Sequence, residues 1–325
     1  MSPLPASDPS PEATVAAKLS VITVTYESRR CLQERAADLA ALPNWIVVDN
    51  ASRDGTIDWL HSQFPQCRVI ANPRNEGFAR ANNRALAEVR TPYALLLNPD
   101  CRIDAASLRA LVDCAERYPD AALIGPRYIS AEGRPLQCYR PFVHRRQGLR
   151  GPYVEPSGDL CTDFVTGAAV LVNMANMRAQ GFFDPWYFLY CEDEDLCWNA
   201  RAQGKAVMVA SAALAAHSPM GSSAPRFADL FRRHYCHTLS KLYLRRKLGA
   251  SRPAVSIYAL SILGGSLLGL PLRLLLLSSR RLAQNLARIV AVLTAPFQLS
   301  RRRCEPGPGM LLSSLLSGDD AGSKP

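Results

Sequence analysis

The chain has 325 residues, 48% of them hydrophobic and 20% charged, which is enough for one large α/β domain with an appendage or for two small domains. Its formal net charge of +10 is concentrated in one segment: residues 226–303 hold fifteen Lys or Arg against the single Asp229, whereas residues 1–225 are close to neutral. The arginines of that segment are spaced among leucines, which argues against a nucleic-acid-binding protein.

Residues 1–17 are rich in Pro, Ser and Ala and lack the apolar core of a secretory signal, so we predict a disordered tail there. The ten cysteines occur singly, and none has the spacing of a zinc site. Cys101 and Cys191 stand beside candidate catalytic acids, which favours a reducing cytosol over a disulfide framework.

Strands and helices alternate regularly along residues 18–125. Runs of β-branched and aliphatic residues predict the strands, and Ala-rich or amphipathic stretches predict the helices between them. The predicted strands are 19–25, 45–48, 67–71, 93–97 and 121–125, and the predicted helices are 29–42, 57–64, 77–89 and 105–117. This order is typical of an α/β fold whose mostly parallel sheet has helices on both faces.

Polar residues follow four of these strands: Tyr26, Asp49, residues 72–75 and Asp100. In open α/β sheets, ligands bind beyond the carboxyl ends of the strands. The register of these residues therefore predicts a cleft of mononucleotide size.

The second half of the chain is less regular. Residues 126–162 show little periodicity and are interpreted as an insertion that shapes the acceptor side, followed by a strand at 165–172, a helix at 195–203 and a strand at 206–209. We place the catalytic domain at 18–245, a basic, leucine-rich helical segment at 246–303 and a flexible tail at 304–325.

Four consecutive carboxylates, Glu192 to Asp195, end an aromatic and apolar approach that begins at Phe183. Unpaired buried charge is costly, so a packed interior does not accept four acids. Either they open a solvated helix, where acids favour the N-terminus, or at least one of them is catalytic.

The sequence lacks both glycine-rich nucleotide signatures, G-x-x-x-x-G-K-[ST] and G-x-G-x-x-G after a strand. The alternative is a nucleoside diphosphate held through Mg2+ or Mn2+, hard cations that often take only one or two carboxylates beside phosphate oxygens. Asp100, at the end of an aliphatic strand, is a candidate ligand, and an ordinary Asn-Pro-Asp turn is the structural alternative.

Five ordered blocks resemble a known family. They are Val21–Tyr26, Val47–Thr56, Asn75–Phe78 with Asn82 and Asn83, Leu96–Asp100, and Gly181–Cys197. In this order and spacing they resemble the inverting family 2 glycosyltransferases of the GT-A fold, and within them the rhamnosyltransferase-like branch that builds bacterial cell-surface polysaccharides. The resemblance covers roughly residues 19–223 and is more specific for the family than for the sugar.

The resemblance implies roles for individual residues. Asp193 matches the general base, and Asn98-Pro99-Asp100 stands where the family carries its metal-binding D-x-D, with Asp100 on an Mg2+ or Mn2+ ion. Asn98 replaces an acid, which implies weaker metal affinity. The residues implied in nucleotide-sugar binding are Val24, Thr25, Tyr26, Asp49, Asn75, Gly77, Phe78, Asn82, Asn83 and Asn98, with Asp49 accepting from the pyrimidine N–H.

Three further assignments each keep an alternative. His217 would complete the metal site or touch the diphosphate, although a lone His after a strand is commonly structural. Gly167 and Glu192 would lie on the sugar and acceptor side, with close backbone packing as the alternative for Gly167. Asp195 would equally cap the helix that follows.

The chemistry of sugar transfer agrees with a separated pair of acids. The leaving nucleoside diphosphate must be neutralised, and the attacking hydroxyl must lose its proton to a carboxylate on the opposite face of the sugar. Asp100 and Asp193 supply this pair, and in-line attack inverts the anomeric centre.

Residues 253–272 are uncharged and long enough to span a bilayer. Gly264, Gly265 and Pro271 weaken such a helix, and arginines recur after it, so we favour a helix lying in the interface of an anionic leaflet over a single or hairpin insertion or a soluble packing arm. This placement predicts the cytoplasmic face of the bacterial inner membrane and a polyprenyl-diphosphate-linked saccharide as the acceptor.

The sequence thus predicts a metal-dependent glycosyltransferase that uses a dTDP- or UDP-sugar, with dTDP-rhamnose as the first choice. UDP-galactofuranose and UDP-N-acetylglucosamine are alternative donors, because fold analogy does not separate them. A non-catalytic nucleotide-sugar-binding scaffold is an alternative of another class. Nucleic acid is not expected as a partner.

Overall fold

The computed structural model describes residues 11–130, 132–140, 155–217, 227–275 and 278–300. The chain forms two compact units. The sheet unit comprises Met1–Glu76, Arg80–Phe183 and Asp193–Met220, and the helical unit comprises Gly77–Ala79, Asp184–Glu192 and Gly221–Pro325. Much of the predicted acceptor-side insertion and the whole predicted C-terminal tail lie outside the described residues.

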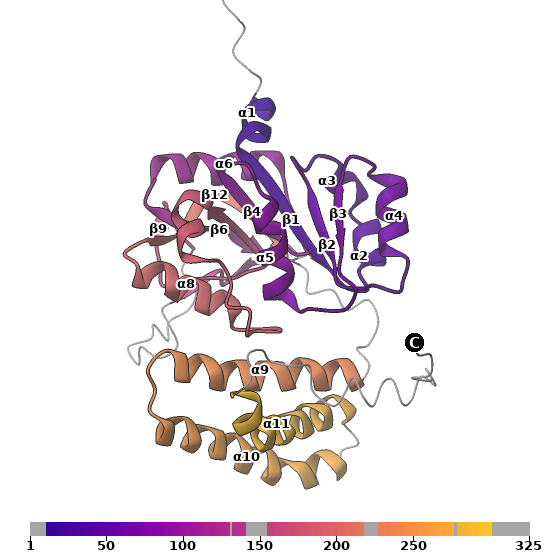
Figure 1. Cartoon of the computed structure of the whole chain (residues 1–325), viewed down its shortest axis with the longest axis vertical. Helices are drawn as coiled ribbons and strands as arrows, with labels where there is room; N and C mark the ends of the chain where they lie inside the picture. Colours follow the sequence, from indigo (N-terminus) through magenta and orange to yellow (C-terminus); the bar gives the residue numbers. More distant parts are fainter. Residues whose placement is uncertain (1–10, 131, 141–154, 218–226, 276–277, 301–325) are drawn as a thin grey trace, which may run out of the picture. The chain divides into compact units, whose positions relative to one another are not determined.

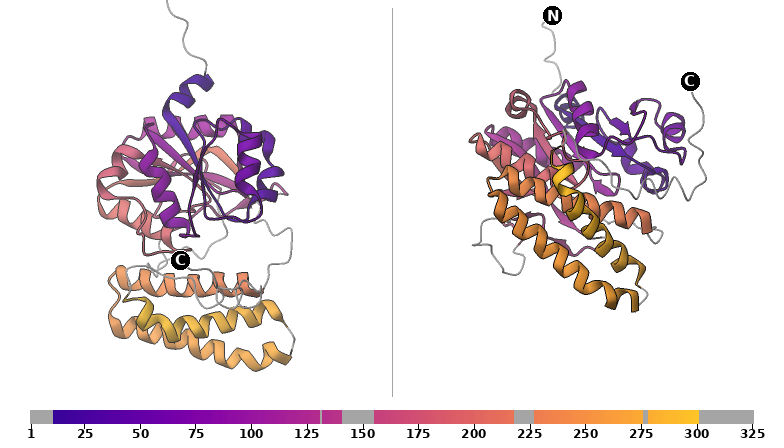
Figure 2. Two further views of the ribbon diagram at one scale, coloured as in Figure 1. Left: turned by 45° about the vertical axis from the view of Figure 1, so that its right-hand side comes forward. Right: turned by 60° about the horizontal axis from the view of Figure 1, so that its bottom comes forward.

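A mixed β-sheet forms the core of the sheet unit (Figures 1 and 2). Its main strands are β1 (Leu19–Thr25), β2 (Ile46–Asp49), β3 (Arg68–Ala71), β4 (Tyr93–Leu97), β5 (Cys101–Ile103), β6 (Ala121–Ile129), β11 (Ala169–Asn173) and β12 (Ala206–His217). Their spatial order is β3-β2-β1-β4-β11-β6-β12-β5. β3, β2, β1 and β4 run parallel, and the nearly complete burial of β1, β2 and β4 matches their aliphatic composition.

The helices that connect the parallel strands cover both faces of the sheet. They are α2 (Arg29–Gln33), α3 (Ala36–Ala40), α4 (Thr56–Gln63) and α5 (Phe78–Glu88), and α6 (Ala105–Arg117) follows β5. The chain steps outward from β1 to β3 and then returns past β1 to β4, so right-handed crossovers put α4 and α5 on opposite faces, with α5 in front in Figure 1.

The helix predicted at 29–42 is two short helices, because Arg35 leaves the helical conformation between them. Its guanidinium is buried and turns to the backbone carbonyls of Asn98 and Pro99. A tertiary contact therefore interrupts a stretch whose local propensity is helical.

The second half of the sheet departs from the predicted strands. β11 is antiparallel to both β4 and β6, and the strand predicted at 165–172 is split into β10 (Phe164–Val165) and β11 by the turn 166–168. β10 pairs with β8 (Tyr139–Arg140), β7 (Pro135–Leu136) pairs with β6, and β9 (Leu160–Cys161) pairs with β12. β12 continues eight residues beyond the predicted strand, with a register shift between Ala210 and Leu214, and ends beside β5.

The N-terminal prediction was wrong in part. Pro11–Lys18 form helix α1 rather than a disordered tail, and Lys18 forms an ion pair with Glu116 of α6. Residues 1–10 of the predicted tail lie outside the described part of the chain.

The helical unit contains α9 (Phe227–Lys247), α10 (Arg252–Leu275) and α11 (Ser279–Gln298). Tyr235 Oη lies 3.1 Å from Thr294 Oγ1 between α9 and α11, and the Arg245 guanidinium lies 3.8 Å from the ring centre of Tyr258 between α9 and α10. The boundary predicted at residue 245 is therefore too late, because α9 packs with the helices that follow it. Within α10, Arg252–Pro271 are long and apolar enough to cross a membrane.

Candidate active site

The loop that follows β2 is organised around Asp49. This fully buried carboxylate accepts hydrogen bonds from Thr25 Oγ1 at 2.8 Å, Ser52 Oγ at 2.6 Å and Ser52 N at 2.8 Å. A carboxylate has about four acceptor positions, so these bonds leave room for about one incoming N–H. Asp49 thus fixes the turn after β2 and keeps capacity for the nucleotide contact predicted for it.

Other strand-end residues of the sheet unit converge beside this loop. Asn50 Oδ1 accepts hydrogen bonds from Asn72 Nδ2 at 2.7 Å and from the Glu76 backbone N–H at 3.4 Å. Tyr26 is held by its backbone, which exchanges two 3.1 Å hydrogen bonds with Ser28 Oγ. Thr25 is buried, whereas Val24, Tyr26 and Asn75 are partly exposed, as a binding surface requires.

The predicted binding residues of the next block fall in both units. In the helical unit, Gly77 has φ +85° and the Phe78 backbone N–H donates to Phe188 O at 2.8 Å. In the sheet unit, Asn82 is buried and the Asn83 amide holds the backbone of Phe183, donating to its O at 2.8 Å and accepting from its N at 2.9 Å. The visible role of Asn83 is therefore structural, and its contact with a nucleotide stays a prediction.

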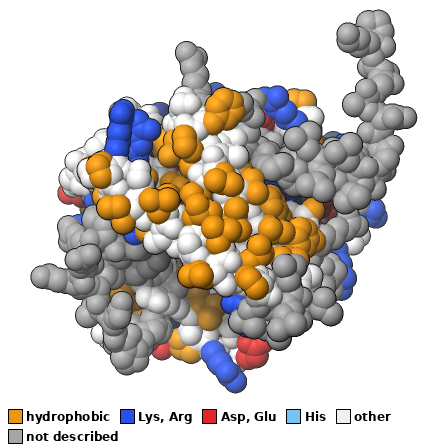
Figure 3. Space-filling view, turned by 90° about the horizontal axis from the view of Figure 1, so that it is seen from below, with side chains coloured by type: hydrophobic (Ala, Val, Ile, Leu, Met, Phe, Trp, Pro, Cys, Tyr) orange, Lys and Arg blue, Asp and Glu red, His pale blue; other side chains and the backbone are white. Residues whose placement is uncertain are grey.

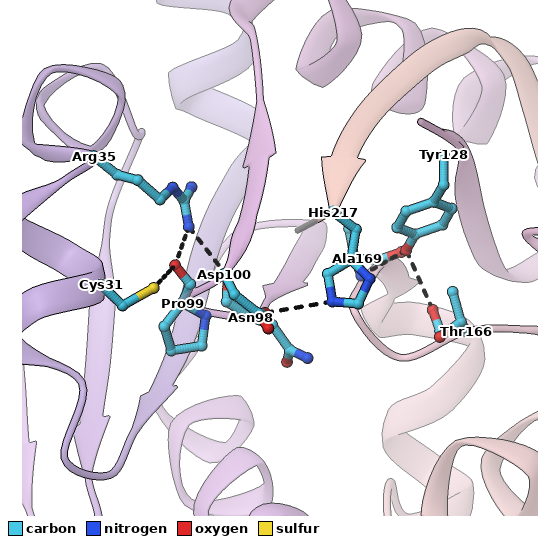
Figure 4. A network of polar contacts seen from close by, with 9 residues as sticks. All are labelled: Cys31, Arg35, Asn98, Pro99, Asp100, Tyr128, Thr166, Ala169 and His217. Carbon is cyan, nitrogen blue, oxygen red and sulfur yellow. Dashed lines mark hydrogen bonds and ion pairs between the residues drawn. The ribbon is translucent and has the colours of Figure 1, made fainter. Parts of the chain in front are cut away.

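Residues outside the motif hold the backbone of the Asn98-Pro99-Asp100 turn in place (Figure 4). Arg35 donates to Asn98 O at 3.4 Å and to Pro99 O, and the Cys31 thiol donates to Pro99 O at 3.0 Å. Burial raises the pKa of Cys31 to about 11, with Asp100 adding to the rise, so this thiol is protonated and able to donate at neutral pH. The turn is thereby held while the Asp100 side chain points away from these contacts.

Asp100 points toward His217, the last residue of β12 (Figure 4). His217 Nε2 lies 3.5 Å from Asp100 Oδ1, and about a quarter of each side chain is exposed. The pairing of β5 with β12 places Cys101 opposite His217. Asp100, the residue before Cys101, is thereby brought close to the His217 side chain. The ring of Tyr128 meets His217 edge-on at 6.3 Å.

One carboxylate and one imidazole are a fitting but incomplete ligand set for a divalent cation. No cluster of three or more His, Cys, Asp or Glu suited to a metal occurs in the described ranges. Mg2+ and Mn2+ take six or so ligands and commonly receive some of them from substrate phosphates. Asp100 and His217 therefore suit an ion shared with a bound diphosphate better than a permanent metal centre.

The acidic block opens α8 (Glu192–Ala202), but three of its four acids do not face solvent, so the alternative of a solvated helix start does not hold for them. Glu192, Glu194 and Asp195 are buried, at 6%, 9% and 0% exposure, and only Asp193 is half-buried. Asp195 lies inside the first turn, where Asn199 Nδ2 donates to it at 3.2 Å, so it does not cap the helix.

Asp193 packs directly on Gly167. The Gly167 backbone N–H donates to Asp193 Oδ2 at 3.2 Å, and the Glu194 N–H donates to Oδ1 at 2.9 Å. A Cβ on Gly167 would stand 3.2 Å from the Asp193 Cβ, which is tighter than nearly all real contacts. Close approach to the carboxylate therefore explains this glycine, in agreement with the packing alternative.

The turn 166–168 links Asp193 with the Asn98–Asp100 turn. Gly167 bonds to Asp193, and the next residue, Ala168, accepts from the Asn98 N–H at 2.8 Å. Tyr128 holds the turn from the other side, donating to Ala169 O at 2.8 Å and accepting from Ala169 N at 2.7 Å. The predicted base and the predicted metal ligand are thus attached to one short turn.

Sequence reasoning missed three supporting residues, Cys31, Arg35 and Tyr128. Arg35 lies in a stretch predicted as plain helix and Tyr128 in the region interpreted as an irregular insertion. A buried Arg has no local signal, because its partners are backbone carbonyls more than sixty residues away.

Comparisons with known proteins show that the chain is similar to glycosyltransferases. The model of the family described as Glycosyl transferase family 2 matches residues 20–156. An N-acetylglucosaminyl-diphospho-decaprenol L-rhamnosyltransferase of Mycobacterium tuberculosis is 26% identical over 211 residues, covering 55% of this chain and 68% of that protein. The rhamnosyltransferase WbbL of Escherichia coli is 27% identical over 192 residues, covering 53% of this chain and 71% of its own length.

A solved structure shows the same fold at low identity. The mannosyltransferase PcManGT of Pyrobaculum calidifontis, in complex with GDP-Man and Mn2+, superposes with a TM-score of 0.53 at 13% identity, over 86% of this chain and 87% of that one. The predicted α/β fold of GT-A type is confirmed. Fold, motif order and sequence matches agree that the chain is similar to the family 2 glycosyltransferases and, among them, to rhamnosyltransferases.

Proposed function

We propose that the protein transfers a sugar, with dTDP-rhamnose as the first candidate donor, to a lipid-linked or polysaccharide acceptor with inversion of the anomeric centre. The observation that carries the proposal is the turn 166–168, which bonds to Asp193 on one side and to the Asn98–Asp100 turn on the other. A displacement at a sugar carbon needs a base and an acid near the leaving phosphates in fixed positions. One turn holds both in this protein.

Asp193 is the general base of the proposed reaction. Its carboxylate takes the proton of the acceptor hydroxyl as the oxygen forms a bond to the anomeric carbon. The bond from that carbon to the nucleoside diphosphate breaks on the opposite face, and its electron pair leaves with the diphosphate, so the configuration inverts. The Gly167 and Glu194 N–H groups orient Asp193, each donating to a different carboxylate oxygen.

Asp100 and His217 hold the phosphate side. Both are partly exposed and face each other, which suits ligands that complete their set with substrate oxygens. Mg2+ or Mn2+, when bound there, supplies positive charge beside the leaving diphosphate. The PcManGT structure is a complex with Mn2+, which supports a divalent cation without choosing between the two.

The nucleotide base binds beside Asp49 and Tyr26 in this proposal. The remaining acceptor capacity of Asp49 suits the ring N–H of a thymine or uracil. A polyprenyl-diphosphate-linked saccharide is the proposed acceptor, supported by the decaprenol-linked substrate in the name of the mycobacterial relative. An enzyme with such an acceptor works at a membrane, and we place it on the cytoplasmic face of the bacterial inner membrane.

Donor hydrolysis by the purified protein tests the proposal. A panel of dTDP-, UDP- and GDP-sugars is incubated with Mg2+ or Mn2+, and release of nucleoside diphosphate is followed for the parent, Asp100→Ala and Asp193→Asn. We expect metal-dependent release from one donor, loss of that dependence in Asp100→Ala, and retained donor binding with lower turnover in Asp193→Asn. No release together with no metal-dependent nucleotide binding would leave a non-catalytic scaffold, and full activity of Asp193→Asn would reject the base.

A further inference from the structure

Large exposed hydrophobic side chains concentrate on two helices of the helical unit. Six of the eight such residues in the described ranges lie on α10 and α11, and the other two are Tyr118 and Phe227. The six, called the apolar face below, are Ile257 at 68% exposure, Leu260 at 63%, Leu267 at 50%, Leu268 at 84%, Leu293 at 66% and Phe297 at 60%. Figure 3 shows hydrophobic side chains gathered on one face of the molecule. A contiguous exposed apolar patch of this kind can mark a site of protein or membrane interaction.

Four of the six residues of the apolar face lie on one side of α10, and another side of that helix is packed. Ile257, Leu260, Leu267 and Leu268 recur at helical spacing over about three turns. On the packed side, Ser266 is buried and its carbonyl accepts from Asn285 Nδ2 of α11 at 3.3 Å, while a Cβ on Gly269 would stand 3.0 Å from the same nitrogen. Among the described residues, α10 thus packs against α9 and α11 and exposes the side that carries these four apolar side chains.

The charged residues of the two helices that carry the apolar face have one sign. Residues 230–303 contain no Asp or Glu, and exposed arginines stand at the start of α10, Arg252, and at the start of α11, Arg280 and Arg281. Guanidinium groups bind phosphate well and are weakly hydrated. Helices that expose both apolar side chains and arginines complement the surface of a leaflet that contains anionic lipid.

We propose that the apolar face docks into the interfacial region of an anionic leaflet, with α10 and α11 lying along the membrane surface rather than crossing it. Crossing by α10 alone would break its contacts with α11. Crossing by both helices would carry Arg280 and Arg281 through the hydrocarbon and would leave Arg288 and the buried Asn285 inside it. A second copy on the same face would bring the like-charged arginines together.

Vesicle flotation of the full chain tests this, with phosphatidylcholine vesicles with and without phosphatidylglycerol. Ile257→Glu with Leu268→Glu is expected to weaken binding at least about tenfold, because two apolar side chains lose their burial in lipid. Arg280→Gln with Arg281→Gln is expected to weaken binding to anionic vesicles about fivefold for each arginine and to leave neutral vesicles unaffected. Matched controls that should bind like the parent are Tyr118→Glu, and Arg30→Gln with Arg68→Gln, all exposed in the sheet unit.

Three results would overturn the docking proposal. The first is the absence of vesicle binding, or binding that the Ile257 and Leu268 changes leave intact. The second is binding that neither salt nor alkaline carbonate reverses, which would mean insertion across the bilayer. The third is a stable dimer in light scattering that Leu268→Glu dissolves, which would assign the apolar face to a second copy. None depends on catalysis, so the docking proposal stands or falls independently of the proposed reaction.

A separate observation concerns the loop Asp184–Glu192, which belongs to the helical unit and leads into Asp193. Asp184 accepts hydrogen bonds from Tyr243 Oη at 2.9 Å and Lys247 Nζ at 2.7 Å, both on α9. The rings of Trp186 and Tyr243 stack at 3.8 Å with 9° between their planes. Burial works to raise the pKa of Asp184, but the hydrogen bond from Lys247 leads the contacts that lower it, so the carboxylate is ionised in this pair.

The last residues of this loop are strained, and α9 holds them. Tyr190 and Cys191 have φ of +71° and +64°, a left-handed conformation that costs a residue with a Cβ about 1 kcal/mol or more. Ser240 Oγ of α9 donates to Leu189 O at 3.0 Å, and His237 meets the Tyr190 ring edge-on at 5.4 Å. Strain of this kind persists only where the surroundings impose it.

We infer that Tyr243 and Lys247 of α9 are positioning residues. They hold the loop Asp184–Glu192 through Asp184, and this loop leads directly into Asp193. This inference rests on the proposed role of Asp193. Glu192, the last residue of this loop, is joined by a peptide bond to Asp193, so a change in the strained turn reaches the backbone that enters α8.

Steady-state kinetics of Lys247→Met and Tyr243→Phe test the inference. Turnover is expected to fall about tenfold, with a smaller rise in donor KM, because misplacement of a base slows the chemical step most. Lys247→Arg should restore most of the turnover, and Arg246→Met, an exposed neighbour on the same helix, should match the parent. Thermal unfolding of each variant identifies any that lose activity by unfolding.

The outcomes separate the positioning role from the base itself. Lys247→Met as active as Arg246→Met, while Asp193→Asn is inactive, would reject the positioning role and keep the base. Full activity of Asp193→Asn would reject the base and the positioning role with it.

Discussion

Gly167→Ala tests the placement of Asp193 with the smallest change the chain permits. The added Cβ would stand 3.2 Å from the Asp193 Cβ, whereas ordinary contacts begin near 3.4 Å and extend to 4 Å, so the carboxylate must shift by a few tenths of an ångström. Since misplacement by about 1 Å costs on the order of a hundredfold in rate, this shift is expected to lower turnover roughly 4- to 15-fold.

The other properties of Gly167→Ala should change little. The donor KM should stay within about twofold, because Gly167 contacts the base rather than the nucleotide residues. The free energy of unfolding should change by no more than about 1 kcal/mol, because Gly167 has no left-handed backbone to lose. Gly158→Ala is the matched control, since nothing lies within 4 Å of a Cβ at that position.

The assay is donor hydrolysis or transfer, with Asp193→Asn and the double variant measured in parallel. In the Asp193→Asn variant, turnover is expected to fall by about 100-fold or more. Adding Gly167→Ala to that variant should have no further effect, because the group it displaces no longer acts as a base. Gly167→Ala with the turnover of Gly158→Ala, beside an inactive Asp193→Asn, would refute the argument that this contact positions the base.

Three further predictions concern stability. Arg35→Met should lower the free energy of unfolding by about 2 kcal/mol and weaken metal-dependent nucleotide binding, because the carbonyls of the Asn98–Asp100 turn lose a charged donor. Chemical denaturation measures the first effect and calorimetric titration the second. An unchanged titration would contradict the second. Gly77→Ala should cost more than Gly204→Ala in thermal unfolding, because both have positive φ but only at Gly77 would the Cβ stand 2.4 Å from Phe188 O; equal costs would contradict the close approach. Burial, followed by the positive charge of Lys241, lowers the pKa of His237 from 6.5 to about 4. The neutral form of His237 therefore contributes fully to folding stability above pH 6.5, and this contribution is lost as the pH falls toward 4. With solvent screening this loss is about 2 kcal/mol, and it should be absent from the pH dependence of unfolding of His237→Gln.

Much of the sheet unit could be predicted because its strands are buried on both faces. Uninterrupted aliphatic stretches such as Tyr93–Leu97 announce a buried strand, and the element found there has the predicted bounds. Helix α6, at Ala105–Arg117, also has the predicted bounds, because Asp104 caps it by accepting from the Ser107 N–H at 2.7 Å. Where local composition and tertiary burial agree, sequence reasoning is enough.

Elements defined by partners distant in the sequence were predicted poorly. β12 extends to His217 only because β6 and β5 pair with its second half, and its composition after Ala210 carries little strand signal. α9 reads as the end of the catalytic domain until its packing against α11 is seen. A solvated helix start was one of two interpretations of the acids that include Glu192, Glu194 and Asp195, because isolated charges avoid the interior. These three are buried, since a folded chain can supply partners that a linear sequence does not display.

The sequence by itself determined the candidate chemistry of this protein: which side chains follow which strands, the order of the motif blocks, and the basic, acid-free character of the C-terminal helices. Tertiary structure alone decided that Asp100 meets His217, that Gly167 touches Asp193, and that α9 holds the loop before α8. The physical reason is distance along the chain. Strand and helix patterns arise from neighbours within a few residues, whereas each of these contacts joins residues 26 to 117 positions apart, which only the folded sheet and the packed helices bring together.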